Sequence, residues 1–181
     1  MRKFLVTNFL FLTFLLAQNA YSQNYREHDL NNSVAFGLSH THIFKGELNG
    51  EPKWTILPSF MLDYDYYITE KWSAGAHFDM IVETFLYRME DDAENVELVE
   101  RSFPVTLVGT GSYKVFEYLS AQVGAGGEFV REGEVYTIIR AGLEGEYEVG
   151  EYYEFFLNAS YDYRINAYHS LTVGFGIKRF F

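Results

Sequence analysis

Residues 153–181 read YEFFLNASYDYRINAYHSLTVGFGIKRFF, and the alternation in this stretch decides the fold. Apolar and polar residues alternate along the chain on both sides of a predicted turn between residues 165 and 169. Alternation with a period of two is typical of a β-strand whose two faces meet different surroundings. On the strand over residues 153–165, one face carries Phe155, Leu157, Ala159, Tyr161 and Tyr163, and the other carries Glu154, Asn158, Ser160, Asp162 and Arg164.

The same alternation recurs along the chain from Ser33 onward and predicts eight strands. Turn residues separate them, and an even number lets antiparallel neighbours close into a ring without an unpaired edge. The predicted strands cover residues 33–44, 54–67, 72–86, 99–113, 118–130, 135–148, 153–165 and 169–181.

The polar face of these strands separates a membrane barrel from a soluble β-sandwich. Carboxylates and arginines occupy mid-strand positions among glycines and serines. A sandwich would have to bury the tyrosine-rich apolar faces in one core about 10 Å thick. A small outer-membrane barrel turns the apolar face to lipid and the polar face to the lumen. We therefore predict an all-β fold, an eight-stranded antiparallel up-and-down transmembrane β-barrel.

The connections between strands support this arrangement. Those around residues 69–71, 115–117 and 149–152 are short, whereas 45–53 and 88–98 are longer and polar. Short periplasmic turns and longer external loops are the outer-membrane pattern.

The N-terminal residues predict export. Arg2 and Lys3 precede an apolar run over residues 4–16, and Ala20 and Ser22 fit a signal-peptidase site. The run is shorter than the ~20 residues that a spanning helix needs. We expect a cleaved signal peptide at 1–22, a periplasmic segment at 23–32 and an outer-membrane barrel at 33–181.

Composition narrows the range of partners. The net charge of −11 argues against nucleic acid, since binding phosphate backbones requires clustered cations. There is no cysteine, so disulfides are excluded. No pattern in the sequence predicts a cofactor.

Some segments resemble a known class of proteins. Residues 64–76 (YDYYITEKWSAGA) and 118–129 (YLSAQVGAGGEF) look like strand–turn–strand units of the bacterial "outer membrane protein beta-barrel domain" class, typified by OmpX and the OmpA membrane domain. Phe175, Ile177 and Phe181 resemble the C-terminal sorting signal of outer-membrane barrels. The resemblance implies location in the outer membrane. It also implies outer-membrane lipid, lipopolysaccharide and the barrel assembly machinery as partners.

The inward face is predicted to carry a polar network, which we interpret as self-satisfying ion pairs that fill the lumen. Because acids outnumber bases, a cation-preferring conduit or a small-ligand or metal site remains an alternative. His77, Asp79 and Glu83, with Asp63 and Asp65 on the next strand, lack a fixed ligand motif. The predicted network comprises Asp63, Asp65, His77, Asp79, Glu83, Glu128, Arg140, Glu144, Glu146, Asp162, Arg164 and Lys178.

His40 and His42 share a face near the outer end of the first strand and suggest an outer-rim site. They invite comparison with lipid A-modifying barrels, which require a serine on the same face as the base. Ser39 and Thr41 lie on the opposite face, and the pair His169–Ser170 has the same defect. An enzyme is therefore the least favoured hypothesis.

The remaining features are an aromatic set and an acidic loop. The loop at residues 90–97 is interpreted as solvated, with calcium or lipopolysaccharide binding as the alternative. We expect a structural or surface-interaction role rather than catalysis. The aromatic residues expected to anchor the barrel at the two membrane interfaces are Trp54, Trp72, Tyr64, Tyr66, Tyr67, Tyr161, Tyr163, Phe180 and Phe181.

Overall fold

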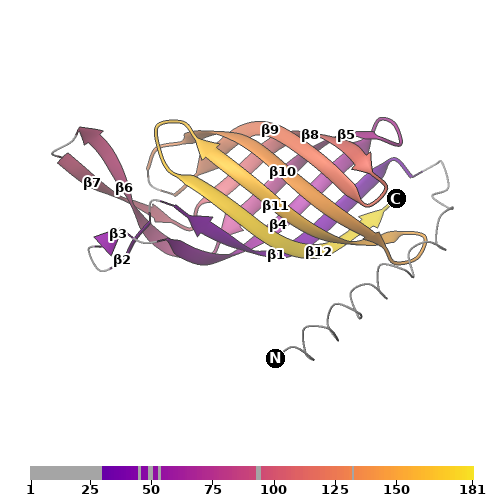
Figure 1. The fold of residues 1–181 in the computed structure, drawn as a ribbon, viewed down its shortest axis with the longest axis horizontal. Helices are drawn as coiled ribbons and strands as arrows, with labels where there is room; N and C mark the ends of the chain where they lie inside the picture. The colour runs from indigo at the N-terminus through magenta and orange to yellow at the C-terminus, as the bar shows by residue number, and fades with distance from the viewer. Residues whose placement is uncertain (1–29, 45, 49–50, 53, 93–94, 132) are drawn as a thin grey trace, which may run out of the picture.

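Eight antiparallel strands close into a barrel in the computed structural model, which confirms the predicted fold class (Figure 1). The structure describes residues 30–181 except 45, 49–50, 53, 93–94 and 132. Around the barrel the order is β1-β12-β11-β10-β9-β8-β5-β4. The barrel strands are β1 (Asn32–Ile43), β4 (Thr55–Tyr67), β5 (Trp72–Ile81), β8 (Val105–Phe116), β9 (Leu119–Phe129), β10 (Tyr136–Glu148), β11 (Tyr153–Arg164) and β12 (His169–Phe180).

Pairing of the first and last strands closes the ring. The register between β1 and β12 runs from Ser33 opposite Phe180 to Ile43 opposite Ser170. On its other side β1 pairs with β4, and β11 pairs with β12. Every strand of the barrel therefore has two hydrogen-bonded neighbours, and no strand edge faces outward.

Burial alternates along the strands, as the sequence pattern predicts, and does so most regularly on β1, β4, β11 and β12. On β11, Glu154, Asn158 and Asp162 are buried, whereas Leu157 is 60% exposed and Tyr161 41% exposed. The buried face is polar and the exposed face apolar, which is the reverse of a water-soluble protein. Among the described residues, no helix has the length and apolarity that a membrane crossing needs.

A second sheet extends beyond one end of the barrel, where the sequence predicted loops. Its order is β3-β2-β6-β7, and it appears at the left of Figure 1. The predicted loop 88–98 is instead most of a β-hairpin, and 45–53 contributes two short strands. The four strands are β2 (Gly46–Leu48), β3 (Glu51–Pro52), β6 (Thr84–Asp92) and β7 (Asn95–Ser102).

The predicted third and fourth strands were therefore too long at the end where they meet the hairpin. The third, 72–86, breaks at Val82 and Glu83, so that β5 stays in the barrel and β6 leaves it. The fourth, 99–113, breaks at Phe103 and Pro104. Phe103 adopts φ 46°, a left-handed conformation that ordinary residues rarely take, and this local turn separates β7 from β8.

Close strand approach depends on glycine at particular places. A Cβ at Gly126 would overlap the carbonyl oxygen of Leu107 on the facing strand, whereas one at Gly111 would meet nothing within 4 Å. Gly126 is therefore required by the packing of β8 against β9, and Gly111 is not.

Candidate functional site

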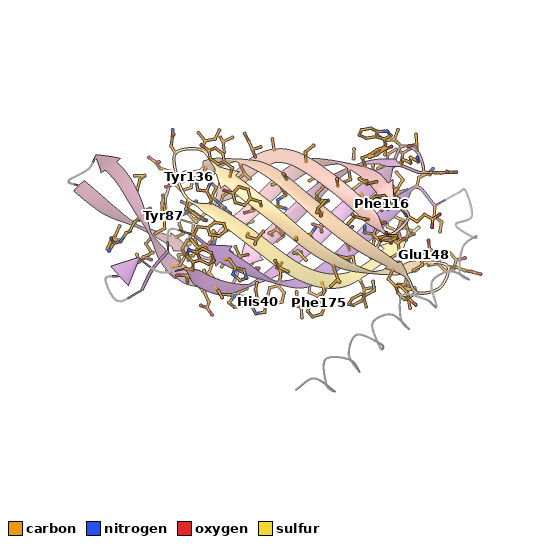
Figure 2. All side chains as sticks on the ribbon, viewed as in Figure 1. His40, Tyr87, Phe116, Tyr136, Glu148 and Phe175 are labelled. Carbon is orange, nitrogen blue, oxygen red and sulfur yellow. The ribbon has the colours of Figure 1, made fainter. Side chains whose placement is uncertain are left out.

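The inward-facing side chains form a column of polar groups along the lumen. Figure 2 shows Tyr87 and Tyr136 at the hairpin end of the barrel and Phe116 and Glu148 at the opposite end. Burial removes these groups from water, so each charge needs a partner inside the barrel. Of the predicted lumen residues, the buried ones are Asp63, Asp65, His77, Asp79, Glu128, Arg140, Glu144, Asp162, Arg164 and Lys178.

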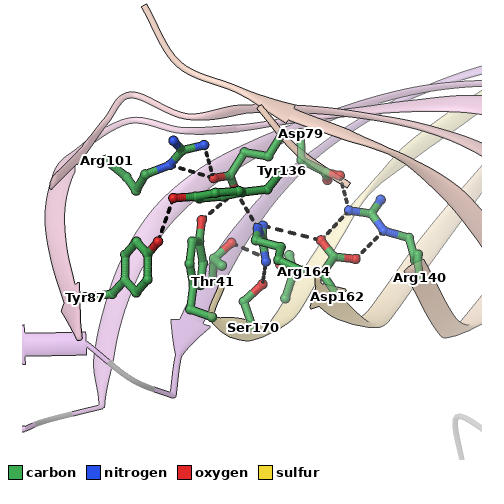
Figure 3. Close-up of polar contacts among 12 residues, drawn as sticks. Thr41, Asp79, Tyr87, Arg101, Tyr136, Arg140, Asp162, Arg164 and Ser170 are labelled. Atoms are coloured by element: carbon green, nitrogen blue, oxygen red, sulfur yellow. Dashed lines mark hydrogen bonds and ion pairs between the residues drawn. The ribbon is translucent and has the colours of Figure 1, made fainter. Parts of the chain in front are cut away.

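The carboxylate of Glu128 on β9 organises the end of the column nearest the hairpin. It has no exposed surface. Arg101 donates to its Oε1 from Nε (2.9 Å) and Nη2 (2.7 Å). Arg164 Nε and the Tyr168 hydroxyl each donate to Oε2 at 2.5 Å. Two guanidinium groups and one phenol thus surround a single buried carboxylate, and Figure 3 shows both arginines converging there.

Arg101 reaches this carboxylate from outside the barrel strands. It lies on β7 of the hairpin, and its Nη1 also donates to the carbonyl oxygen of Glu134 at 2.8 Å. The guanidinium lies 4.3 Å from the Tyr136 ring centre, and that of Arg164 lies 4.3 Å from the Tyr168 ring centre. The hairpin is therefore tied to the lumen by a buried ion pair and by stacking on aromatic faces.

A cluster of buried apolar and aromatic side chains, here called the plug, lies at the hairpin end of the lumen. The Tyr87 and Tyr136 hydroxyls are hydrogen-bonded at 2.7 Å, and the Tyr87 ring lies 4.8 Å from that of Tyr168. Burial raises the pKa of Tyr168 and of Tyr87 well above the usual range, so both phenols remain protonated donors. The plug consists of Ile43, Leu57, Ile81, Phe85, Tyr87, Tyr136 and Tyr168.

Arg140 holds the next layer of the lumen together. It binds Asp162 through two parallel bonds, Nε to Oδ1 at 2.7 Å and Nη2 to Oδ2 at 2.8 Å. The same Nη2 lies 2.6 Å from Asp79 Oδ2, which makes a second ion pair. Arg164 Nη2, at 3.7 Å from Asp162 Oδ2, links this layer to the one around Glu128. A bidentate arginine bridging two strands is the geometry expected of a stable buried pair.

His77 lies between two aspartates of β4. Its Nε2 is 3.2 Å from Asp65 Oδ1, and its Nδ1 is 3.7 Å from Asp63 Oδ1. In the described part of the chain, no group of three or more histidines, aspartates and glutamates is placed to hold a metal ion. Asp79, a predicted member of such a group, is instead paired with Arg140.

A vestibule opens at the end with the short turns. Lys178 Nζ lies 2.5 Å from Glu144 Oε1 and 3.5 Å from Glu146 Oε1, and Lys114 Nζ lies 3.4 Å from Glu146 Oε2. The space is open to solvent, and its lining reaches inward as far as His77. Lys114 and Lys178 are thus paired with Glu144 and Glu146 across its walls, and the Arg140 layer lies further along the lumen.

Three sequence predictions about side-chain direction were wrong. Glu83 lies in the bend between β5 and β6 and is exposed, because the strand leaves the barrel before reaching it. Phe180 is buried at 3% exposure and packs on the half-buried Tyr67, with ring centres 5.5 Å apart. Both rings point into the barrel and cannot anchor it at an interface. Phe175, Ile177 and Phe181 do face outward.

His40 and His42 face outward from β1. Their partners on neighbouring strands are Pro58 and Val173 for His40, and Ile56 and Leu171 for His42. None of these residues is a serine or an acid. Ser39 and Thr41 point inward and hydrogen-bond to Ser59, at 2.7 and 2.9 Å. The structure therefore does not bring together the nucleophile and base that a lipid-modifying site would need.

Two sets of predictions fall on residues outside the described structure. These are the signal peptide with most of the segment 23–32, and the side chains of the acidic stretch 90–97.

Sequence reasoning missed Arg101, Tyr87, Tyr136 and Tyr168 as lumen residues. Phe85 and Tyr87 continue the inward phase of β5, which was a usable signal. Arg101 lies out of phase with the inward residues of β8, and Tyr168 lies in a turn, so alternation could not identify either.

Comparisons with known proteins support the fold. No protein-family model matches the sequence, and no curated protein matches it. The structure is similar to the outer membrane protein OprG from Pseudomonas aeruginosa, with a TM-score of 0.54, 11% identity, and coverage of 87% of this chain and 99% of that one. It is also similar to Neisserial surface protein A, with a TM-score of 0.53, 13% identity, and coverage of 83% and 97%. At these identities the likeness shows a shared fold, the small outer-membrane β-barrel.

Proposed function

We propose that this chain is an integral outer-membrane protein in which a sealed barrel anchors the β3-β2-β6-β7 sheet at the cell surface. The inverted barrel carries the proposal, because its wall is apolar while its interior is charged. Water would penalise such a large continuous apolar surface, whereas lipid would not. The outward residues include Phe36, Leu38, Phe60, Leu62, Leu107, Val123, Ile139, Leu143, Leu157, Val173, Phe175 and Ile177, which are 41–65% exposed.

The strand lengths fit the thickness of a bilayer. The barrel strands contain 10–13 residues, and a tilted transmembrane strand needs about 9–11. Exposed aromatic side chains lie toward both ends of the wall, as at membrane interfaces. One group contains Trp54, Tyr161 and Tyr163, and the other contains Trp72, Tyr64, Tyr66, Tyr152 and Tyr153.

The two ends of the barrel suggest its orientation. The short turns after Tyr67, Phe116 and Glu148 lie at one end, and the hairpin β6–β7 extends from the other. Outer-membrane barrels keep short turns in the periplasm and long extensions outside. We therefore assign the second sheet to the cell surface, reached after export by the predicted signal peptide.

The contents of the lumen support a sealed barrel. The plug occupies the hairpin end, and the Arg140 and Glu128 layers fill the interior below it. An ion would have to displace paired charges to pass. These contacts favour an anchor over the alternative of a narrow cation-preferring pore, and the residues facing His40 and His42 give no support to the enzyme.

Location and orientation can be tested together in intact cells. The outer-membrane fraction should contain a form that migrates differently on SDS gels with and without boiling. An epitope tag between Ala93 and Glu94 should be labelled in intact cells, whereas a tag between Gly150 and Glu151 should be labelled only after permeabilisation. A soluble protein without heat-modifiable migration would refute the membrane assignment, and the opposite labelling pattern would refute the orientation.

Conductance measurements test whether the lumen is sealed. Purified protein inserted into planar bilayers, with insertion verified by protease protection, should give no stepwise conductance. Reproducible cation-selective steps would overturn the sealed lumen and favour the pore.

A further inference from the structure

Three histidines gather on one patch of the outer wall. His40 and His42 lie on β1, and His169 lies on the adjacent strand β12. Of the other two histidines in the sequence, His77 lies in the lumen and His28 outside the described residues. Between the two aromatic groups, no carboxylate occupies an outward-facing position on the described barrel strands. The patch is therefore a local concentration of nitrogen donors on an apolar surface.

Strand register places the three histidines in a row along the wall, with His42 between His40 and His169. His42 lies opposite Leu171, and the Phe44 N–H donates to the His169 carbonyl at 3.2 Å, so His169 is opposite Phe44. His169 and His42 are therefore diagonal neighbours on one face, where side chains are about 7–8 Å apart or less. His40 follows on the same face, one alternation further from the hairpin.

An aromatic row borders this patch on the hairpin side. The Phe44 ring contacts those of Trp54 and Tyr161, at 5.3 and 6.1 Å between centres. His169 stacks between Tyr161 (6.0 Å) and Tyr163 (4.8 Å). Such rows mark the depth at which a membrane wall meets lipid headgroups. The histidines thus lie at and just beneath headgroup level.

Imidazole rings at the depth of the lipid headgroups can donate hydrogen bonds to an anionic partner. A neutral ring donates one N–H and a protonated ring donates two. Within the described part of the chain, no side chain hydrogen-bonds to His40 or His42. A metal ion is disfavoured, because no suitable ligand group occurs among the described residues. The headgroup component that accepts N–H bonds most strongly is phosphate.

We propose that His40, His42 and His169 form a row of hydrogen-bond donors that binds the phosphate groups of an outer-leaflet lipid. Below the histidines, Leu38 and Phe36 on β1 and Phe175 on β12 give the acyl chains an apolar bed. These apolar residues and the aromatic row favour a lipid over free phosphate as the ligand. The inference also rests on the proposed membrane location, since the patch must face a bilayer.

The test compares lipid retention on purified, folded protein by native mass spectrometry. The probes are bisphosphorylated lipid A, lipid A without phosphates, and inorganic phosphate. The triple variant H40L/H42L/H169F removes the donors but keeps an apolar wall and an aromatic ring at position 169. Loss of charge-assisted bonds should weaken retention of bisphosphorylated lipid A by about tenfold or more. Retention of the dephosphorylated lipid should be unchanged.

Arg179, which faces outward near the opposite end of β12, provides the matched control. R179Q should retain the phosphorylated lipid as the unmodified protein does. Equal retention by the triple variant, or loss in R179Q alone, would overturn the site. Binding of inorganic phosphate as tightly as the lipid would also refute it. Heat-modifiable migration of each sample verifies the fold. Failure of the membrane location would appear in cell fractionation and not in this assay.

Discussion

Replacing Glu128 by glutamine removes the charge at the centre of the hairpin-end network while keeping the shape of the side chain. In the folded protein this carboxylate is fully buried and accepts bonds from Arg101, Arg164 and Tyr168. After E128Q, Arg101 still donates to the Glu134 carbonyl, and Arg164 keeps Ser170 and the 3.7 Å contact with Asp162. Two buried guanidinium groups then lose their main counter-charge.

Breaking a buried ion pair on one side destabilises a protein by about 3–5 kcal/mol. The glutamine oxygen can still accept one or two of the bonds, so the lower half of that range applies here. We expect E128Q to lower the free energy of unfolding by about 3 kcal/mol. The exposed Glu148 at the end of β10 is the matched control, and E148Q should change it by less than about 0.5 kcal/mol.

The measurement is urea unfolding in phospholipid vesicles, followed by the fluorescence of the outward-facing Trp54 and Trp72. The double variant E128Q/R164Q should regain part of the free energy of unfolding that E128Q loses. The Arg164 charge, which E128Q leaves without its main partner, is absent from the double variant. A shift in E128Q no larger than that in E148Q, or full additivity of E128Q and R164Q, would refute the view that this carboxylate holds the network together.

Two further predictions test separate parts of the structure. G126A should abolish the heat-modifiable form because its Cβ would overlap the Leu107 carbonyl, whereas G111A, with nothing within 4 Å, should fold normally; equal folding of both would contradict the packing of β8 on β9. Burial raises the folded-state pKa of Tyr168 above its unfolded value, so its stabilising contribution is present below about pH 10 and is lost above it. Unfolding titrations from about pH 8 to 11 should therefore show a steeper loss of stability in the unmodified protein than in Y168F, and parallel curves would show that this phenol does not contribute.

The sequence predicted the barrel because lipid and lumen impose a period of two on every strand. It could not reveal where strands change partners. From β5 into β6 the inward phase continues through Ile81, Phe85 and Tyr87, although the hydrogen-bonded neighbour changes from β8 to β7. Alternation reports which face a residue occupies and carries no information about the strand opposite. The hairpin was therefore interpreted as a loop flanked by two long strands.

The candidate site was predictable where its residues keep the phase of their strand, as Asp162 and Arg140 do. At Phe103 the chain turns and the inward phase shifts from odd to even numbers, so the alternation of β8 could not predict that Arg101 faces inward. Individual pairings could not be predicted either. The partners of Glu128 come from β7, β11 and the turn before β12, and only the closed barrel brings them together.

The pairing of β1 with β12 has a genetic consequence. Ser33 and Phe180 are direct partners, so the first strand remains half-paired until the last one exists. A chain lacking β12 would leave two rows of backbone donors and acceptors exposed to hydrocarbon, which has no means of satisfying them. A stop codon just before His169 should therefore be as damaging as loss of the whole gene, because no shortened barrel is available as a partial substitute.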